Sequence, residues 1–258
     1  MNKIEWNKYF DHIFALSLVN NTDRRADAIE DWERLGLLDC GIFEWKLTVD
    51  NPLYNYIWTN PYLPAPKWWL GIKNALNCTL GHYEIMLQSL ALGYKKVLIL
   101  EDDARFHKDV NVVKRVLDAV PEYDICLLDK FTPMPKDLLN DALANHRVND
   151  EFISFDTVRL WSCACYGVSE KAMKSILEQQ TKNWCPADDV TNIVDNWGKR
   201  YKTDGLTRVA AVTNIAVQDQ HYKRYKSQQE YDIDVFIYQG VADKSDYNVK
   251  NVEPPKFD

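Results

Sequence analysis

The feature that most limits what this chain can fold into is a short apolar run that ends in three acids. Residues 96–100 read KVLIL, and Glu101, Asp102 and Asp103 follow directly. An apolar run this short, bounded by polar residues, is typical of a buried strand. In open α/β sheets, ligands bind beyond the carboxyl ends of the strands. The pattern therefore predicts an α/β fold with a ligand site at this strand end.

The start of the chain supplies a β-α-β unit that fits such a sheet. Residues 12–19 form a second apolar run, a helix is expected over about residues 24–35, and a strand near residues 42–47. Thr22 or Asp23 would cap the helix at its start. This order of elements favours a nucleotide-binding type of α/β domain, with a central, mostly parallel, twisted sheet flanked by helices.

Further helices and strands follow along the chain. Apolar residues at three-and-four spacing predict an amphipathic helix over residues 71–92. Other helices are expected over 110–120, after Ser169 and over 188–197, and strands over 123–128, within 152–168 as strand pairs, and over 209–212. Because no internal repeat or low-complexity linker separates these elements, we expect one domain over residues 1–220, with residues 221–258 as a tail on it.

A long segment, residues 50–69, differs from the rest. It contains four prolines with tyrosines and tryptophans between them. Because prolines break both helices and sheets, we expect a surface loop here. Loops of this length often act as lids or binding edges, although the rings could equally form a cover over the core.

Composition narrows the function classes. The net charge is −7 and no basic tract occurs, which disfavours general binding to DNA. None of the six cysteines forms a CxxC pair, so we expect no zinc knuckle and a reducing compartment. No stretch is typical of a signal peptide or a membrane span, and this favours a cytoplasmic location.

The three acids themselves indicate a metal. Adjacent carboxylates repel one another and need a cation to compensate their charge, and hard oxygen ligands suit Mn²⁺ or Mg²⁺. Taken alone, Glu101, Asp102 and Asp103 also fit a solvated strand end that caps the next helix, or a metal-dependent hydrolase.

Five ordered motifs resemble glycosyltransferase family 25, the group that contains lipooligosaccharide and procollagen galactosyltransferases. The resemblance spans about residues 12–220. Its motifs are Ser17-Leu18 with Asp23-Arg24-Arg25, the helix segment 77–82 (NCTLGH), the strand end 98–103 (LILEDD), the segment 163–169 (CACYGVS) and Pro186-Ala187-Asp188. Two motifs depart from the family, which usually has Asn-Leu at 17–18, and Gly and Ser where Asn77 and Gly81 stand here.

The resemblance implies a GT-A fold, a nucleotide-diphosphate sugar donor, Mn²⁺ or Mg²⁺, and inversion at the sugar carbon. Glu101 and Asp103 are the expected metal ligands, and Asp102 is a ligand or a ribose contact. His221 is a candidate extra ligand. Asp188 matches the family's Pro-x-Asp position and is the expected general base, with Asp189 as the alternate, although an Asp that opens a helix is also a favoured cap.

The remaining candidates surround the donor. Arg24 and Arg25 could bind the diphosphate, because a guanidinium suits phosphate. Ser17, Asn77 and His82 occupy family motif positions and are expected to contact the donor, although a lone histidine is more often structural. Gly81 would allow a ligand to approach closely.

The identity of the substrates stays open in the sequence. A UDP-hexose is the favoured donor and a bacterial surface glycan the favoured acceptor, as in lipopolysaccharide biosynthesis. A protein or a modified nucleobase is an open alternative acceptor. The same residues would also suit a phosphoesterase, or a sugar-binding module without turnover.

Overall fold

A computed structural model describes residues 3–49, 73–129, 144–155, 163–182 and 205–219. The helices are η1 (Trp6–Lys8), α1 (Thr22–Glu33), α4 (Lys73–Leu92), α5 (Val110–Asp118) and α7 (Glu170–Lys182). The strands are β1 (His12–Leu18), β2 (Phe43–Thr48), β3 (Lys96–Glu101), β4 (Ala104–Phe106), β5 (Ile125–Leu127), β6 (Phe152–Ser154), β7 (Cys165–Ser169), β8 (Arg208–Ala211) and β9 (Ala216–Gln218).

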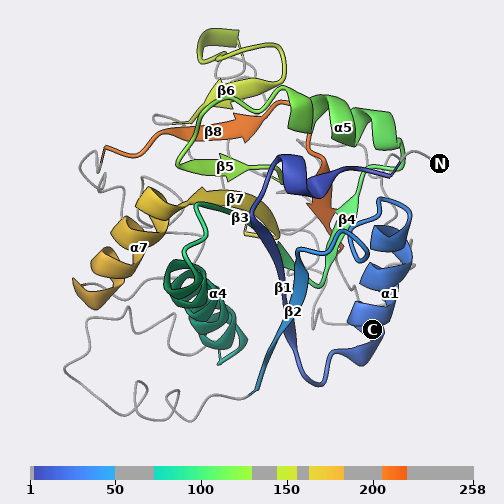
Figure 1. Ribbon diagram of the computed structural model, residues 1–258, viewed down its shortest axis with the longest axis vertical. Coiled ribbons are helices and arrows are strands. Elements are labelled where there is room, and N and C mark those ends of the chain that lie inside the picture. The colour runs from blue at the N-terminus through green and yellow to red at the C-terminus, as the bar shows by residue number, and fades with distance from the viewer. Residues whose placement is uncertain (1–2, 50–72, 130–143, 156–162, 183–204, 220–258) are drawn as a thin grey trace, which may run out of the picture.

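The main sheet confirms the predicted α/β architecture. Its seven described strands lie in the order β2-β1-β3-β7-β5-β8-β6 (Figure 1). Strands β2, β1, β3, β5 and β8 run in one direction, and β7 and β6 run in the other. The sheet is therefore mostly parallel, and helices cover it on both sides.

Alternation along β1 explains how both faces of the sheet are buried. Ile13 and Ala15 point into the core that α1 and α5 share with the sheet. Phe14 and Leu16 point into the opposite core, which α4 and α7 complete. Strands buried on both faces are apolar throughout rather than alternating, which is why β1 and β3 stand out in the sequence.

The site is positioned by the parallel pairing of β1 and β3. Leu16 lies opposite Glu101, so the carboxyl ends of both strands meet at one edge of the sheet. Helix α4 packs closely over this edge, because a Cβ atom on Gly81 would collide with the side chain of Leu16. The expectation that Gly81 admits a ligand is therefore wrong. The space that a side chain would fill is occupied by the side chain of Leu16 from β1.

Several local predictions need correction. The cap of α1 is Asn21 rather than Thr22 or Asp23, and its side chain makes no capping hydrogen bond. Strands β6 and β7 do not pair with each other, because β6 pairs with β8 while β7 lies between β3 and β5. The small sheet of β4 and β9 was also not predicted from the sequence. By contrast, Ser169 accepts a hydrogen bond from the backbone of Ala172 and caps α7, as expected.

Two predicted elements, the helix over 188–197 and the aromatic loop over 50–69, lie outside the described residues. The proposed tail, residues 221–258, lies outside them as well, so the division at residue 220 stays a prediction. Among the described helices, none is long and apolar enough to cross a membrane.

Candidate functional site

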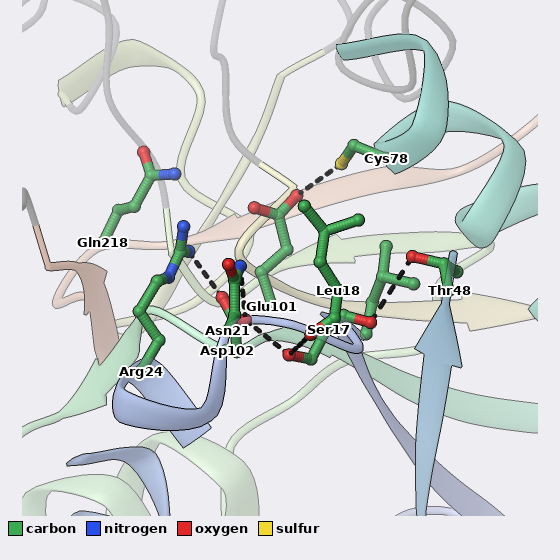
Figure 2. A pocket seen from close by; sticks show the side chains of 10 residues that line it. Ser17, Leu18, Asn21, Arg24, Thr48, Cys78, Glu101, Asp102 and Gln218 are labelled. Atoms are coloured by element: carbon green, nitrogen blue, oxygen red, sulfur yellow. Dashed lines mark hydrogen bonds and ion pairs between the residues drawn. The ribbon is translucent and has the colours of Figure 1, made fainter. Parts of the chain in front are cut away.

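A pocket of about 390 Å³ lies where β1 and β3 end (Figure 2). Its walls come from the end of β1, the start of α1, the end of β2, helix α4, the acidic strand end and β9. The lining residues are Leu16, Ser17, Leu18, Asn21, Arg24, Thr48, Cys78, Glu101, Asp102 and Gln218. This is the position at which the strand pattern predicts a ligand site.

Arg24 joins the two aspartates of the strand end. Its Nη2 atom lies 2.5 Å from Oδ1 of Asp102 and 2.6 Å from Oδ2 of Asp103. Both aspartates are buried, whereas 28% of the Arg24 side chain is exposed. The expectation that three adjacent acids need an added cation is therefore only partly right, because the protein supplies a positive charge of its own.

Asp102 is held by a polar network at the end of β1. Ser17 Oγ donates a hydrogen bond of 2.6 Å to Asp102 Oδ2, and Asn21 Nδ2 donates one of 3.2 Å to the same oxygen. Arg25 in turn donates to Ser17 Oγ at 3.0 Å and to the carbonyl oxygens of Leu18 and Val19. Arg25 therefore faces the backbone of the β1–α1 turn and fixes the residues that orient Asp102.

Asp103 is buried and incompletely hydrogen-bonded. Its Oδ2 atom accepts a hydrogen bond of 3.1 Å from Gln218 Nε2, while Oδ1 has no hydrogen-bond partner among the described residues. Burial raises the pKa of Asp103 to about 7, and the positive charge of Arg24 opposes that rise. A buried acceptor without a partner is costly, and such groups often mark a bound ion or water.

Glu101 turns away from the two aspartates and toward helix α4. Its Oε1 atom lies 3.2 Å from His82 Nε2 and accepts a hydrogen bond of 3.3 Å from Cys78 Sγ. Burial alone would raise the pKa of Glu101, but the hydrogen bonds with His82 and Cys78 and the charge of Arg24 lower it overall. On its other side, His82 Nδ1 lies 3.0 Å from the hydroxyl oxygen of Tyr166.

The structure thus brings most of the predicted site residues to one place. Those within or directly behind the pocket wall are Ser17, Arg24, Arg25, His82, Glu101, Asp102 and Asp103. Asn77 is buried on α4 and is not part of the pocket wall. Asp188, Asp189 and His221 lie outside the described residues.

Four residues of the pocket wall with hydroxyl, thiol or amide side chains were missed in the sequence: Asn21, Thr48, Cys78 and Gln218. Cys78 carried a usable signal, because it precedes His82 by four residues and side chains at that spacing share one face of a helix. Asn21 and Gln218 carried no comparable signal, since each is a single amide in a turn or a short strand.

Part of the chain is similar to proteins of a known family. Residues 72–191 match glycosyltransferase family 25 (LPS biosynthesis protein), a segment that includes helix α4 and the acidic strand end. A "Glycosyltransferase 25 family member" from Anopheles gambiae is 29% identical over 104 residues. That alignment covers 37% of this chain and only 17% of the mosquito protein.

The class of protein that these matches resemble is the glycosyltransferases. The matched segment of this chain is similar to glycosyltransferase family 25.

Solved structures of low identity have loosely similar shapes. The inositol-1-phosphate CTP transferase from T. maritima is 12% identical with a TM-score of 0.42, and the comparison covers 91% of this chain and 98% of that one. A mannose-1-phosphate geranyltransferase from Thermus thermophilus is 10% identical with a TM-score of 0.36, over 78% of this chain and 73% of that one.

Proposed function

We propose that this chain is a metal-dependent, inverting glycosyltransferase with a GT-A-like fold, which moves a hexose from a nucleotide-diphosphate sugar to a hydroxyl group of a glycan. The observation that carries the proposal is the pocket at the ends of β1 and β3, where Arg24 and the acids 101–103 meet. A phosphate-binding cation and a cluster of metal-binding oxygens are two features that stabilise a diphosphate leaving group.

The acids at this strand end fit a hard divalent cation such as Mn²⁺ or Mg²⁺. Asp103 offers a buried oxygen without a hydrogen-bond partner among the described residues, and Asp102 is held rigidly beside it. When bound, the cation would act as a Lewis acid that stabilises the negative charge on the departing diphosphate. Asp103 is the first ligand we propose, and Asp102 is favoured over Glu101 as the second because His82 and Cys78 already engage Glu101. His221 stays a candidate further ligand.

Arg24 would also bind the donor. Its guanidinium reaches both aspartates from a partly exposed position on the pocket wall. A planar guanidinium binds phosphate oxygens in pairs, so Arg24 would contact the diphosphate of the donor. Before the donor binds, the same group neutralises the acids, and this keeps the site compact.

Transfer to a hydroxyl group also requires a base. An inverting displacement removes the proton of the acceptor hydroxyl as the new bond forms, and we propose Asp188 for this step, with Asp189 as the alternate. Arg25 and Ser17 act as positioning residues, because they orient Asp102 through hydrogen bonds. His82 supports the site from behind through Glu101.

The substrates follow from the family rather than from individual contacts. A UDP-hexose is the donor we propose, and a surface glycan is the acceptor we propose, in keeping with the family description as an LPS biosynthesis protein. The described pocket wall offers amide, hydroxyl and guanidinium groups that suit a polar donor, and its aliphatic part is formed by Leu16 and Leu18.

A thermal-shift screen of nucleotide sugars with and without Mn²⁺ tests the proposal. A ligand that binds only the folded state stabilises it by about 2.7 kcal/mol at a concentration of about 100 times its Kd. We expect a nucleotide-diphosphate sugar to raise the melting temperature in a manner that depends on Mn²⁺. Donor turnover that needs an acceptor would identify a transferase, whereas equal hydrolysis without acceptor would identify a phosphoesterase, and binding without turnover a sugar-binding module.

A further inference from the structure

We propose that Cys78, His82 and Glu101 form a binding site for a soft or borderline divalent cation such as Zn²⁺, separate from the hard-cation position at Asp102 and Asp103. Neither the family match nor the transfer chemistry requires a thiolate ligand at this position. The inference stands independently of the proposed function, because it concerns metal binding alone.

The three ligand atoms lie close together, and two of their three separations match those that a metal would impose. The thiol sulfur, an imidazole nitrogen and a carboxylate oxygen lie within 4.8 Å of one another. Sγ of Cys78 is 3.3 Å and Nε2 of His82 is 3.2 Å from the same atom, Oε1 of Glu101. Tetrahedral zinc with bonds of about 2.0–2.3 Å separates its ligand atoms by roughly 3.2–3.7 Å. Two of the three separations therefore already fit such an ion, and the third is at most 4.8 Å.

The ligands are also carried by rigid elements. Cys78 and His82 are one helical turn apart on α4, so their side chains project from the same face. Glu101 ends β3, the strand that lies between β1 and β7 in the sheet. Between this helix and the sheet, the side chain of Leu16 fills the space beside Gly81. A site assembled from a helix and a central strand is better ordered than one built on loops.

Tyr166 supplies the support that a metal-binding histidine requires. Its hydroxyl lies 3.0 Å from Nδ1 of His82, on the side of the ring opposite Glu101. Metal-binding histidines usually donate their second N–H to such a partner, which fixes the ring and its tautomer. Because a hydroxyl both donates and accepts, Tyr166 can accept from Nδ1–H when Nε2 binds a metal.

The fourth coordination position would face the pocket. Cys78 and Glu101 belong to the pocket wall, as Figure 2 shows, whereas His82 is fully buried behind them. Three protein ligands with one open position are typical of zinc sites at which water or a substrate oxygen binds. The ion would therefore contact water, or an oxygen atom of whatever molecule occupies the pocket.

The choice of ligands separates this site from the hard-cation position. A thiolate and an imidazole favour Zn²⁺ and Co²⁺, whereas Mn²⁺ and Mg²⁺ prefer carboxylate and water oxygens. The competing explanation is a hydrogen-bonded trio that never binds metal. The two explanations differ in whether the sulfur of Cys78 becomes a thiolate bonded to a metal.

Co²⁺ titration of the full chain, stripped of metal with EDTA, distinguishes them. Co²⁺ bound by a thiolate gives a sulfur-to-metal charge-transfer absorption band, which a site made of carboxylates alone does not give. We expect the band to saturate at one Co²⁺ per chain and to disappear on addition of Zn²⁺. Cys78→Ser should abolish it, while Cys40→Ser, the matched control at a thiol outside the cluster, should keep it.

Co²⁺ titration of Tyr166→Phe provides a second test, in a protein that retains all three proposed ligands. Loss of a supporting hydrogen bond typically weakens metal binding by about 10–100-fold, so the Co²⁺ titration should shift by that factor while the band keeps its shape. The proposal is overturned if wild-type protein shows no charge-transfer band, if the band survives Cys78→Ser, or if Tyr166→Phe binds Co²⁺ as tightly as wild type.

Discussion

Arg24 Nη2 lies 2.6 Å from Oδ2 of the buried Asp103, so a positive charge from helix α1 occupies the acidic strand end. The same nitrogen contacts Asp102. A divalent cation at these oxygens would have to compete with the guanidinium, and a diphosphate would draw the guanidinium toward itself. Removing the charge of Arg24 should therefore strengthen metal binding and weaken donor binding.

Arg24→Gln should bind Mn²⁺ more tightly than wild type without donor, because the competing charge is gone. The KM for the donor should rise about tenfold or more, since hydrogen bonds to charged groups contribute about 1.5–3 kcal/mol. Without metal, the variant should lose about 1–3 kcal/mol of stability, less than the roughly 3–5 kcal/mol of a fully buried pair, because Arg24 is 28% exposed.

Isothermal titration with Mn²⁺ and steady-state kinetics measure these two effects. Arg115→Gln is the matched control, because it removes a largely exposed arginine from an ion pair with Glu151. If Arg24→Gln binds Mn²⁺ more weakly than wild type, the competition between guanidinium and cation is refuted.

Stability of the metal-free protein should depend on the ionisation of Asp103. Its pKa is raised to about 7, so between about pH 4 and pH 7 the folded state binds a proton that the unfolded state has lost. This group therefore makes the protein less stable as pH rises through that window, and its effect levels off above about pH 7. Urea unfolding in EDTA should show this dependence in wild type and a weaker one in Asp103→Asn. If the free energy of unfolding depends equally on pH in both proteins, the raised pKa does not belong to Asp103.

Asp188→Asn should lower turnover by about 10²–10⁴-fold with donor binding close to normal, as expected when a general base is removed. Steady-state kinetics combined with a donor-binding assay measure both quantities. If Asp189→Asn lowers turnover strongly and Asp188→Asn lowers it only slightly, the general base is Asp189.

The aromatic segment over residues 50–69 should act as a lid that shields the donor from water. Under this hypothesis Trp58→Ala raises KM or increases donor hydrolysis with little change in melting temperature, and Trp68 and Trp69 are the next residues to test. A stability loss of about 3–5 kcal/mol with unchanged kinetics of the folded fraction would instead assign the ring to the core.

The parts of the fold that could be predicted are those whose signal is local in the sequence. Strands β1 and β3 are buried on both faces and therefore appear as continuous apolar runs, and α4 carries apolar residues at three-and-four spacing. The sheet of β4 and β9 could not be predicted, because each strand has only three residues and their pairing joins Ala104 to Gln218 across the chain.

The site was predictable in its location but not in its internal contacts. The acids at the end of β3 indicated where a ligand would bind, and the pocket lies there. Which side chain each acid contacts depends on tertiary structure. Glu101 contacts His82 from α4, while Asp102 and Asp103 form ion pairs with Arg24 from α1. These contacts cannot be predicted from the spacing of residues along the chain.

Asp103→Asn tests the central claim most directly, with Asp39→Asn, at an exposed surface ion pair, as the control. The measurement is Mn²⁺-dependent transfer of a hexose from a UDP-sugar to a glycan acceptor, with the melting temperature recorded in EDTA. We expect transfer to be abolished in Asp103→Asn at a melting temperature no lower than that of wild type, because a neutral side chain relieves repulsion among the buried acids. Full transfer by this variant, or by wild type after exhaustive removal of metal, would contradict the account.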